Sequence, residues 1–231
     1  MRLGNHPLTA LLFATTVAVL ALMQSYFPTV LAIPLPGSNI RPVLLLEMAS
    51  QPQHLIHIFG PTDDPLRPAR ISGMNTGNAI DYLLMVSYAL LTLSFFFGIA
   101  QELGSNIWRL FGWLGVIAAL ADATENWLMF RMVAHIADPS AEMAVLPYPV
   151  WIKFGLLALT CGAAAWAFVG LRRWALAALS LPAIVMLIPG FLDPLHVAPM
   201  ATALIGLGWL AMALHAVSRW WSSRRTARPA A

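Results

Sequence analysis

Six apolar runs, most of them long enough to cross a lipid bilayer, are the feature that most constrains how this chain folds. A spanning helix needs about 20 mainly apolar residues, because it rises about 1.5 Å per residue and the hydrocarbon core is about 30 Å thick. The 231 residues are 59% hydrophobic and only 10% charged, which excludes a soluble domain. We therefore predict an all-α fold, a polytopic membrane helix bundle that forms a single transmembrane domain over residues 1–231. The predicted spans are about 8–33, 78–100, 108–134, 150–171, 174–188 and 201–217.

The first run also has features of a cleaved signal peptide, because a basic residue, Arg2, precedes it. The apolar core of a signal peptide is usually about 7 to 15 residues long. This run continues from Leu8 to Ile33, with only a short polar interruption. We therefore expect it to remain in the protein as the first span.

Residues 34–77 form the only long stretch outside the predicted spans. From Val43 to Phe59, apolar residues alternate with polar ones at helical spacing, provided that Pro52 only kinks or restarts the helix. This pattern predicts an extracytoplasmic amphipathic helix in the membrane interface. The polar side chains that would share one side of that helix are Glu47, Gln51, His54 and His57.

Basic residues predict the orientation of the bundle. With six spans both termini lie on one side, and the positive-inside rule places the side with more Arg and Lys in short loops and tails in the cytoplasm. One side collects Arg2, Arg109, Arg172, Arg173, Arg219, Arg224, Arg225 and Arg228, whereas the other has Arg41, Arg67, Arg70, Arg131 and Lys153. We therefore predict that the N- and C-termini are cytoplasmic.

The third span carries two carboxylates near its middle, Asp122 and Glu125, followed by Asn126. A charged side chain at the centre of a bilayer costs roughly 2.5 to 3.5 kcal/mol on insertion scales, so such groups normally face a protein interior. At about 100° per residue the three side chains share one face of the helix. Small residues such as Gly115 and Ala118 continue that face, which predicts close packing against another helix.

The second span carries a polar stripe that includes Asp81 and Tyr88. Measured from the outer helix ends at about 1.5 Å per residue, Tyr88 and Glu125 lie at the same depth, and Asp81 matches Arg131. We therefore predict a polar pocket between the two stripes in the outer half of the bundle, roofed by residues 43–59, with an ion pair between Asp81 and Arg131. The residues predicted to bind a substrate or ion are Asp122, Glu125, Asn126, Tyr88, Asp81 and Arg131.

A purely structural interpretation competes with a binding site. A protonated Asp122 or Glu125 that hydrogen-bonds to Asn126, Thr124 or Tyr88 would only hold helices together. Carboxylates buried in a membrane more often mark a path for ions, protons or substrates, which favours the functional interpretation.

Metal and cofactor signals are weak. Glu47, His54 and His57 have the spacing of a ligand set, but zinc needs three or four convergent ligands and Pro52 interrupts the helix. We predict no metal site and interpret these residues as the polar face of the interfacial helix. His215 lies inside the last predicted span, near its cytoplasmic end, with no partner acid nearby, and no motif identifies a cofactor.

The choice of site residues is supported by a resemblance. The run Asp81-Tyr82-Leu83-Leu84 with Tyr88, followed by Asp122-x-x-Glu125-Asn126 in the third span, resembles a group of uncharacterised bacterial multi-span integral membrane proteins. The likeness covers residues 78–129 and implies a bacterial inner membrane location. It implies no activity.

Three functions are open at this point. The first is binding or transport of a cation, proton or small substrate by the acidic site; the second is an accessory subunit whose polar face meets a membrane protein partner. The third is an intramembrane enzyme that acts on a lipid-like substrate, with one acid as general base and the other as general acid. The expected surroundings are the lipid bilayer and not nucleic acid, because the net charge of +3 gathers at helix ends.

Overall fold

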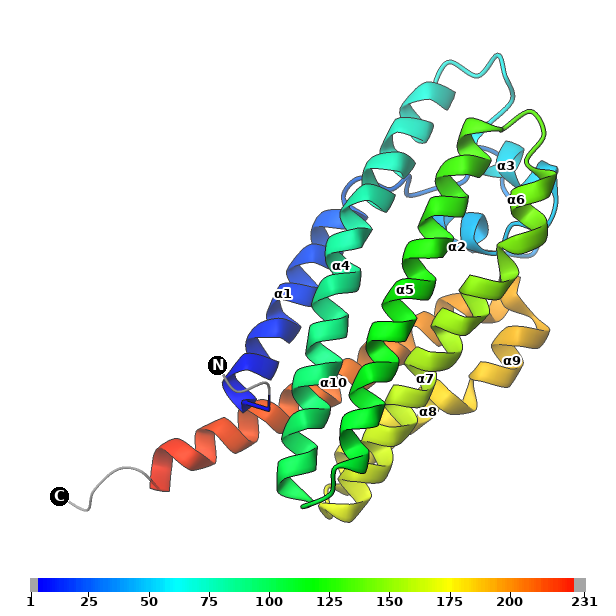
Figure 1. The fold of residues 1–231 in the computed structure, drawn as a ribbon. Helices are drawn as coiled ribbons and strands as arrows, with labels where there is room; N and C mark the ends of the chain where they lie inside the picture. The colour runs from blue at the N-terminus through cyan, green and yellow to red at the C-terminus, as the bar shows by residue number, and fades with distance from the viewer. Residues whose placement is uncertain (1–3, 227–231) are drawn as a thin grey trace.

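Helices form every regular element in residues 4–226, the part of the chain that this computed structural model describes, and no strand occurs there. Figure 1 shows their arrangement. The helices are α1 (His6–Gln24), α2 (Pro42–Glu47), α3 (Pro52–Phe59), α4 (Arg67–Glu102), α5 (Ile107–Ala134), α6 (Ser140–Val145), α7 (Pro147–Gly170), α8 (Trp174–Val185), α9 (Leu187–Leu192) and α10 (Pro194–Thr226).

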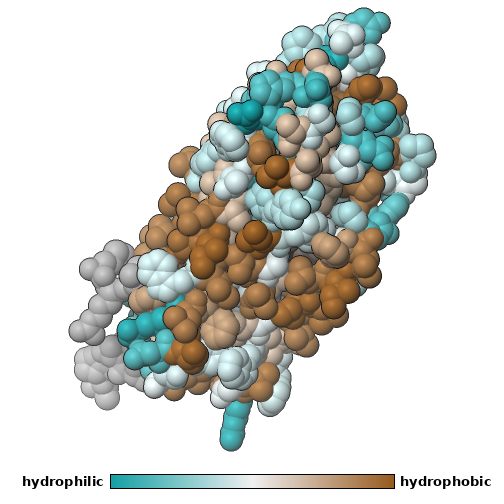
Figure 2. All heavy atoms as spheres, turned by 45° about the vertical axis from the view of Figure 1, so that its right-hand side comes forward, coloured by the Kyte–Doolittle hydropathy of each residue, from teal (hydrophilic) through white to brown (hydrophobic). Residues whose placement is uncertain are grey.

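Six of the helical segments are long and apolar enough to cross a membrane: α1, α4, α5, α6 with α7, α8 with α9, and α10. Figure 2 shows apolar residues over the middle of the face in view and hydrophilic residues toward the two ends. The prediction of an all-α polytopic bundle is therefore confirmed, and the apolar helices belong in a lipid bilayer.

The spanning helices close into a ring. α4 packs against α1 and α5, α5 packs against α7, α7 against α8, and α10 returns from α8 to α1. The start of α1 and the end of α10 lie at one end of the bundle, which we call the terminal end, and α2 and α3 lie at the opposite end, the loop end (Figure 1). Of the basic residues used to predict orientation, Arg2 and Arg228 lie outside the described residues.

Several helix boundaries differ from those expected, among them the end of the first span and the start of the second. α1 ends at Gln24 instead of continuing to Ile33, because Pro28 lacks an N–H and disfavours the helical conformation at Phe27. α4 begins at Arg67, eleven residues before the predicted start at Asn78, with Pro68 in its first turn. Proline is well tolerated there because the first turn leaves its N–H groups unpaired. The second spanning helix is therefore 36 residues long.

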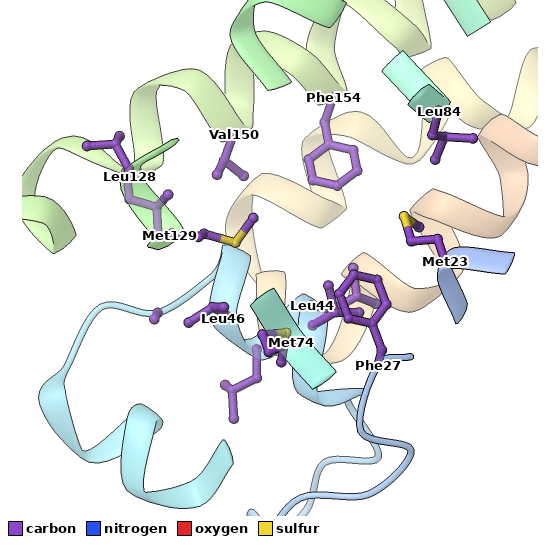
Figure 3. Packing of buried hydrophobic residues seen from close by; sticks show 14 of the residues in the cluster. Met23, Phe27, Leu44, Leu46, Met74, Leu84, Leu128, Met129, Val150 and Phe154 are labelled. Atoms are coloured by element: carbon purple, nitrogen blue, oxygen red, sulfur yellow. The ribbon is translucent and has the colours of Figure 1, made fainter. Parts of the chain in front are cut away.

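The amphipathic segment is two short helices instead of one. Pro52 starts α3, and residues 48–51 separate it from α2. α2 lies inside the end of the bundle, with Leu45 and Leu46 fully buried. Figure 3 shows Leu44 and Leu46 among side chains of the spanning helices, including Met129 of α5. This packing brings the end of α2, and with it Glu47, into the bundle.

Candidate functional site

A single lysine lies among three carboxylates inside the loop half of the bundle. Lys153 of α7 places its Nζ 2.7 Å from Glu125 Oε2, 3.2 Å from Glu47 Oε2 and 3.3 Å from Asp122 Oδ1. Its side chain is 7% exposed, and that of Glu125 is 0% exposed. The carboxylates come from α5 and from the end of α2, so three separate elements form the ion pairs.

Hydrogen bonds connect side chains of α4 to the carboxylates and Asn126 of α5. The Tyr88 hydroxyl donates to Asp122 Oδ2 at 2.9 Å, and Asn126 Nδ2 donates to Asp81 Oδ2 at 2.9 Å and to the Asn78 carbonyl at 3.1 Å. The polar stripes of the second and third spans therefore face each other, as the depth comparison predicts. We call Lys153, Glu47, Asp81, Tyr88, Asp122, Glu125 and Asn126 the Lys153 cluster.

Small residues bring α4 and α5 close enough for these contacts. A Cβ atom added to Gly115 would lie 1.9 Å from Thr92 Oγ1, so no larger residue fits there without a shift of the helices. Ala118, one turn further along α5, is fully buried. Close approach through small residues is the usual way in which membrane helices pack, because lipid gives no hydrophobic driving force between them.

The predicted ion pair between Asp81 and Arg131 was wrong. Arg131 Nε lies 3.0 Å from Glu142 Oε1, which also receives His135 Nδ1 at 3.0 Å. Residues 140–145 form α6, which places Glu142 beside the end of α5. Arg131 therefore forms its ion pair with Glu142, outside the cluster. Asp81 accepts a hydrogen bond from Asn126 instead.

Sequence reasoning missed Lys153 and did not connect Glu47 with the acids of the third span. Lys153 was assigned to a helix end because it is the fourth residue of the predicted 150–171 span. In the structure Pro147 starts α7 earlier, so the lysine lies one and a half turns inside the helix. A lone lysine in an apolar run is itself a signal for a buried acidic partner.

The weak metal candidates of the loop end do not converge. Glu47 faces Lys153, whereas His54 Nδ1 accepts a hydrogen bond from the Ser50 N–H at 3.3 Å. The Nδ1 atom of His57 lies 3.0 Å from the Ile33 carbonyl oxygen. The side chains of these two histidines therefore contact backbone groups and not Glu47.

The cluster carries more acid than base. Its four carboxyl groups face one ammonium group, so full ionisation would bury an excess of negative charge. Burial away from water raises the pKa of Glu47, against the opposing effect of the Lys153 charge, and the negative charge of Asp122 raises it further. An unbalanced buried charge is normally relieved by a proton or by a bound counterion.

Two amide atoms, one in the cluster and one on the neighbouring Asn78, also lack a protein partner. Asn126 Oδ1 and Asn78 Nδ2 are buried without a hydrogen bond. A buried polar atom usually has a partner, because leaving it unpaired costs about 1–3 kcal/mol. One acceptor and one donor are thus available in the same region as the acids.

A narrow apolar crevice lies beside the cluster. It is lined by residues of α7, α8, α9 and α10, including Phe154, and by Met48 next to Glu47. The Lys153 Nζ lies 4.6 Å from the centre of the Phe154 ring. One aromatic side chain therefore separates the crevice from the charged centre.

A second polar group occupies the terminal end. His215, expected to have no acidic partner, lies 3.0 Å through Nε2 from Glu102 Oε1. The two residues are far apart in sequence, at the end of α4 and in α10, so no local pattern could reveal the pair.

The pH dependence of stability tests the burial of Glu47. Because its pKa is raised in the folded protein, the folded state binds more protons than the unfolded state above pH 4.5, the ordinary pKa, and this contribution to stability falls as the pH rises. We expect Glu47→Gln to remove that part of the slope in thermal unfolding measured from pH 4 upward.

Asp64 provides the control of opposite sign. A hydrogen bond from Arg70 lowers the pKa of Asp64, so its contribution is lost as the pH falls below its ordinary value. Asp64→Asn should therefore lower stability at neutral pH, and this difference from the natural protein should disappear toward acid pH. Equal effects of the two variants would contradict the assignment of Glu47 to a buried site.

The fold and these contacts define a multi-pass membrane protein with a charged cluster buried inside its helix bundle. No protein-family model, curated protein or solved structure matches the chain.

Proposed function

We propose that the Lys153 cluster binds and releases protons or a small cation, as a binding or transport site. The observation that carries the proposal is the imbalance of four carboxyl groups against one lysine in a site that is largely buried. Protons or a metal cation held by the acids would remove that imbalance. The unpaired Asn126 oxygen is a further ligand of the kind that hard cations prefer.

In this proposal Lys153 competes with the incoming cation or proton for the carboxylates of the cluster. Its ammonium group contacts all three nearby carboxylates, so an incoming cation or proton weakens the hold of Glu125 and Asp122 on the lysine. The long lysine side chain can then move among its partners without leaving the bundle. Occupancy of the acids and the packing of α7 against α5 are thereby linked.

The proposed location follows the basic residues and the resemblance described above. We place the protein in a bacterial inner membrane with the terminal end in the cytoplasm. The Lys153 cluster, which includes Glu47 at the end of α2, then lies in the extracytoplasmic half, because α2 is at the loop end (Figure 1). Protons or cations would enter from that side.

Binding is tested by thermal unfolding of the protein in lipid nanodiscs. We expect the unfolding temperature to depend on pH and to rise with Na⁺, K⁺ or Li⁺ relative to choline, because a ligand that binds only the folded state stabilises it. Proteoliposomes with an internal pH dye then show whether binding leads to transport. No response to pH or to any of these cations would overturn the proposal.

An enzyme that acts on a lipid-like substrate is the second candidate, supported by the crevice beside Phe154. The cavity volume of the crevice is about 20 Å³, so an apolar chain from the bilayer would have to widen it, and would then end one side chain away from Lys153. Ala201, on the crevice wall, provides the test. Ala201→Trp should reduce the lipid that co-purifies with the protein, measured by native mass spectrometry, and leave the cation response unchanged. Unchanged lipid binding would remove this candidate.

A further inference from the structure

Two histidines and a glutamate meet at the terminal end, on the opposite side of the bundle from the Lys153 cluster. His6 Nε2 lies 3.2 Å from Glu102 Oε1, and His215 Nε2 lies 3.0 Å from the same oxygen. They belong to α1, α4 and α10. Within residues 4–226 this is the one group of three or more His, Cys, Asp and Glu residues whose ligand atoms all lie within 4.8 Å of one another.

The distances fit the edges of a tetrahedral metal site. With bonds of about 2.0–2.1 Å, neighbouring ligand atoms around zinc are about 3.3 Å apart. The two edges that meet at Glu102 Oε1 are 3.2 Å and 3.0 Å. The third edge, between the imidazole nitrogens, is at most 4.8 Å, and rotation of the more exposed His6 side chain can shorten it.

Neighbouring groups hold two of the ligands in place. Arg219 Nε lies 3.3 Å from Glu102 Oε2, which leaves Oε1 free to face the histidines. The His215 ring is 1% exposed and packs against Phe95 and Phe168. A carboxylate fixed by an outer hydrogen bond and an imidazole fixed by packing are typical of metal ligands.

We propose that His6, Glu102 and His215 form a Zn²⁺ site at the terminal end of the bundle. Two imidazole nitrogens and one carboxylate oxygen are a known zinc ligand set with an open fourth position. His6 is the most exposed of the three ligands. Bound zinc would tie α1 and α10, from opposite ends of the chain, to the end of α4.

The ligand atoms could also be held by hydrogen bonds alone, with one histidine protonated, and the experiment separates the two cases. Protein from which any affinity tag has been removed is treated with chelator, loaded with Zn²⁺ in detergent, and analysed for bound metal. Co²⁺ is then used as a spectroscopic probe of the coordination geometry.

We expect one Zn²⁺ per chain, a tetrahedral Co²⁺ spectrum and a Zn²⁺-dependent rise in unfolding temperature. His6→Ala and Glu102→Gln should each weaken Zn²⁺ binding about 100-fold or more, because each removes one of three protein ligands. His6→Ala is the safer variant, since His6 is partly exposed and near the start of α1.

His196→Ala is the matched control, because His196 is also in α10 but is exposed and pairs with Asp193 at the loop end. It should bind zinc as the natural protein does. Failure to retain stoichiometric zinc, or equal zinc binding by the His6→Ala and His196→Ala variants, would overturn the proposal. Either outcome leaves the Lys153 cluster unaffected, since the two sites share no residue.

Discussion

Replacing Lys153 with methionine is expected to lower the free energy of unfolding by about 3–5 kcal/mol at neutral pH, the usual cost of removing one partner from a buried ion pair. Methionine keeps the length of the side chain but leaves Glu47, Asp122 and Glu125 without their shared cation. The loss should shrink as the pH falls, because protonation neutralises the carboxylates. Unfolding of the protein in mixed micelles at several pH values measures both effects.

Two further variants test whether the loss of stability comes from the unpaired carboxylates of the Lys153 cluster. Lys153→Met combined with Glu125→Gln should recover part of the lost stability, since the second change removes one of the unpaired charges. Arg131→Met removes a basic residue from an ion pair whose arginine is 48% exposed, and should cost about 1 kcal/mol or less. Full stability of Lys153→Met at alkaline pH would contradict the buried ion pairs.

Glu125→Gln should abolish most of the response to protons and cations while the protein still folds. Glu125 is the acid with no exposed side-chain surface, and it makes the shortest contact with Lys153. Glutamine preserves its shape but cannot exchange a proton or supply a negative charge. We expect the cation affinity, measured from the shift in unfolding temperature, to fall at least about tenfold, which corresponds to about 1.4 kcal/mol.

The matched control is Glu142→Gln. Glu142 is also a buried glutamate, but it binds Arg131 and His135 outside the cluster. Its variant should keep the response of the natural protein. A Glu125→Gln protein that responded to pH and cations like the Glu142→Gln protein would show that the cluster has only a structural role.

Periodicity and hydropathy predicted the parts of the site that lie on two adjacent helices. Asp122, Glu125 and Asn126 share a helical face by spacing alone, and equal depth placed Tyr88 opposite them. Both inferences depend only on regular helix geometry. They succeeded because α4 and α5 are long and nearly continuous, and adjacent in the chain as well as in space.

The remaining partners depend on tertiary structure that no spacing encodes. Glu47 reaches Lys153 across 106 residues because α2 folds into the end of the bundle, whereas an interfacial helix would have kept it at the surface. His215 reaches Glu102 across 113 residues because α10 closes the ring. Arg131 was assigned to the wrong acid because depth alone cannot distinguish Asp81 from a residue of the neighbouring α6.

The most direct measurement of the central claim is the infrared difference spectrum of the carboxyl groups of the protein in lipid, recorded between acid and alkaline pH and with and without Na⁺. If the Lys153 cluster exchanges protons or cations, the spectrum will contain a band of buried carboxyl groups that changes with pH or Na⁺. That band will be lost or shifted in Glu125→Gln and retained in Glu142→Gln. A spectrum with no buried carboxyl band that responds to either variable would contradict the account.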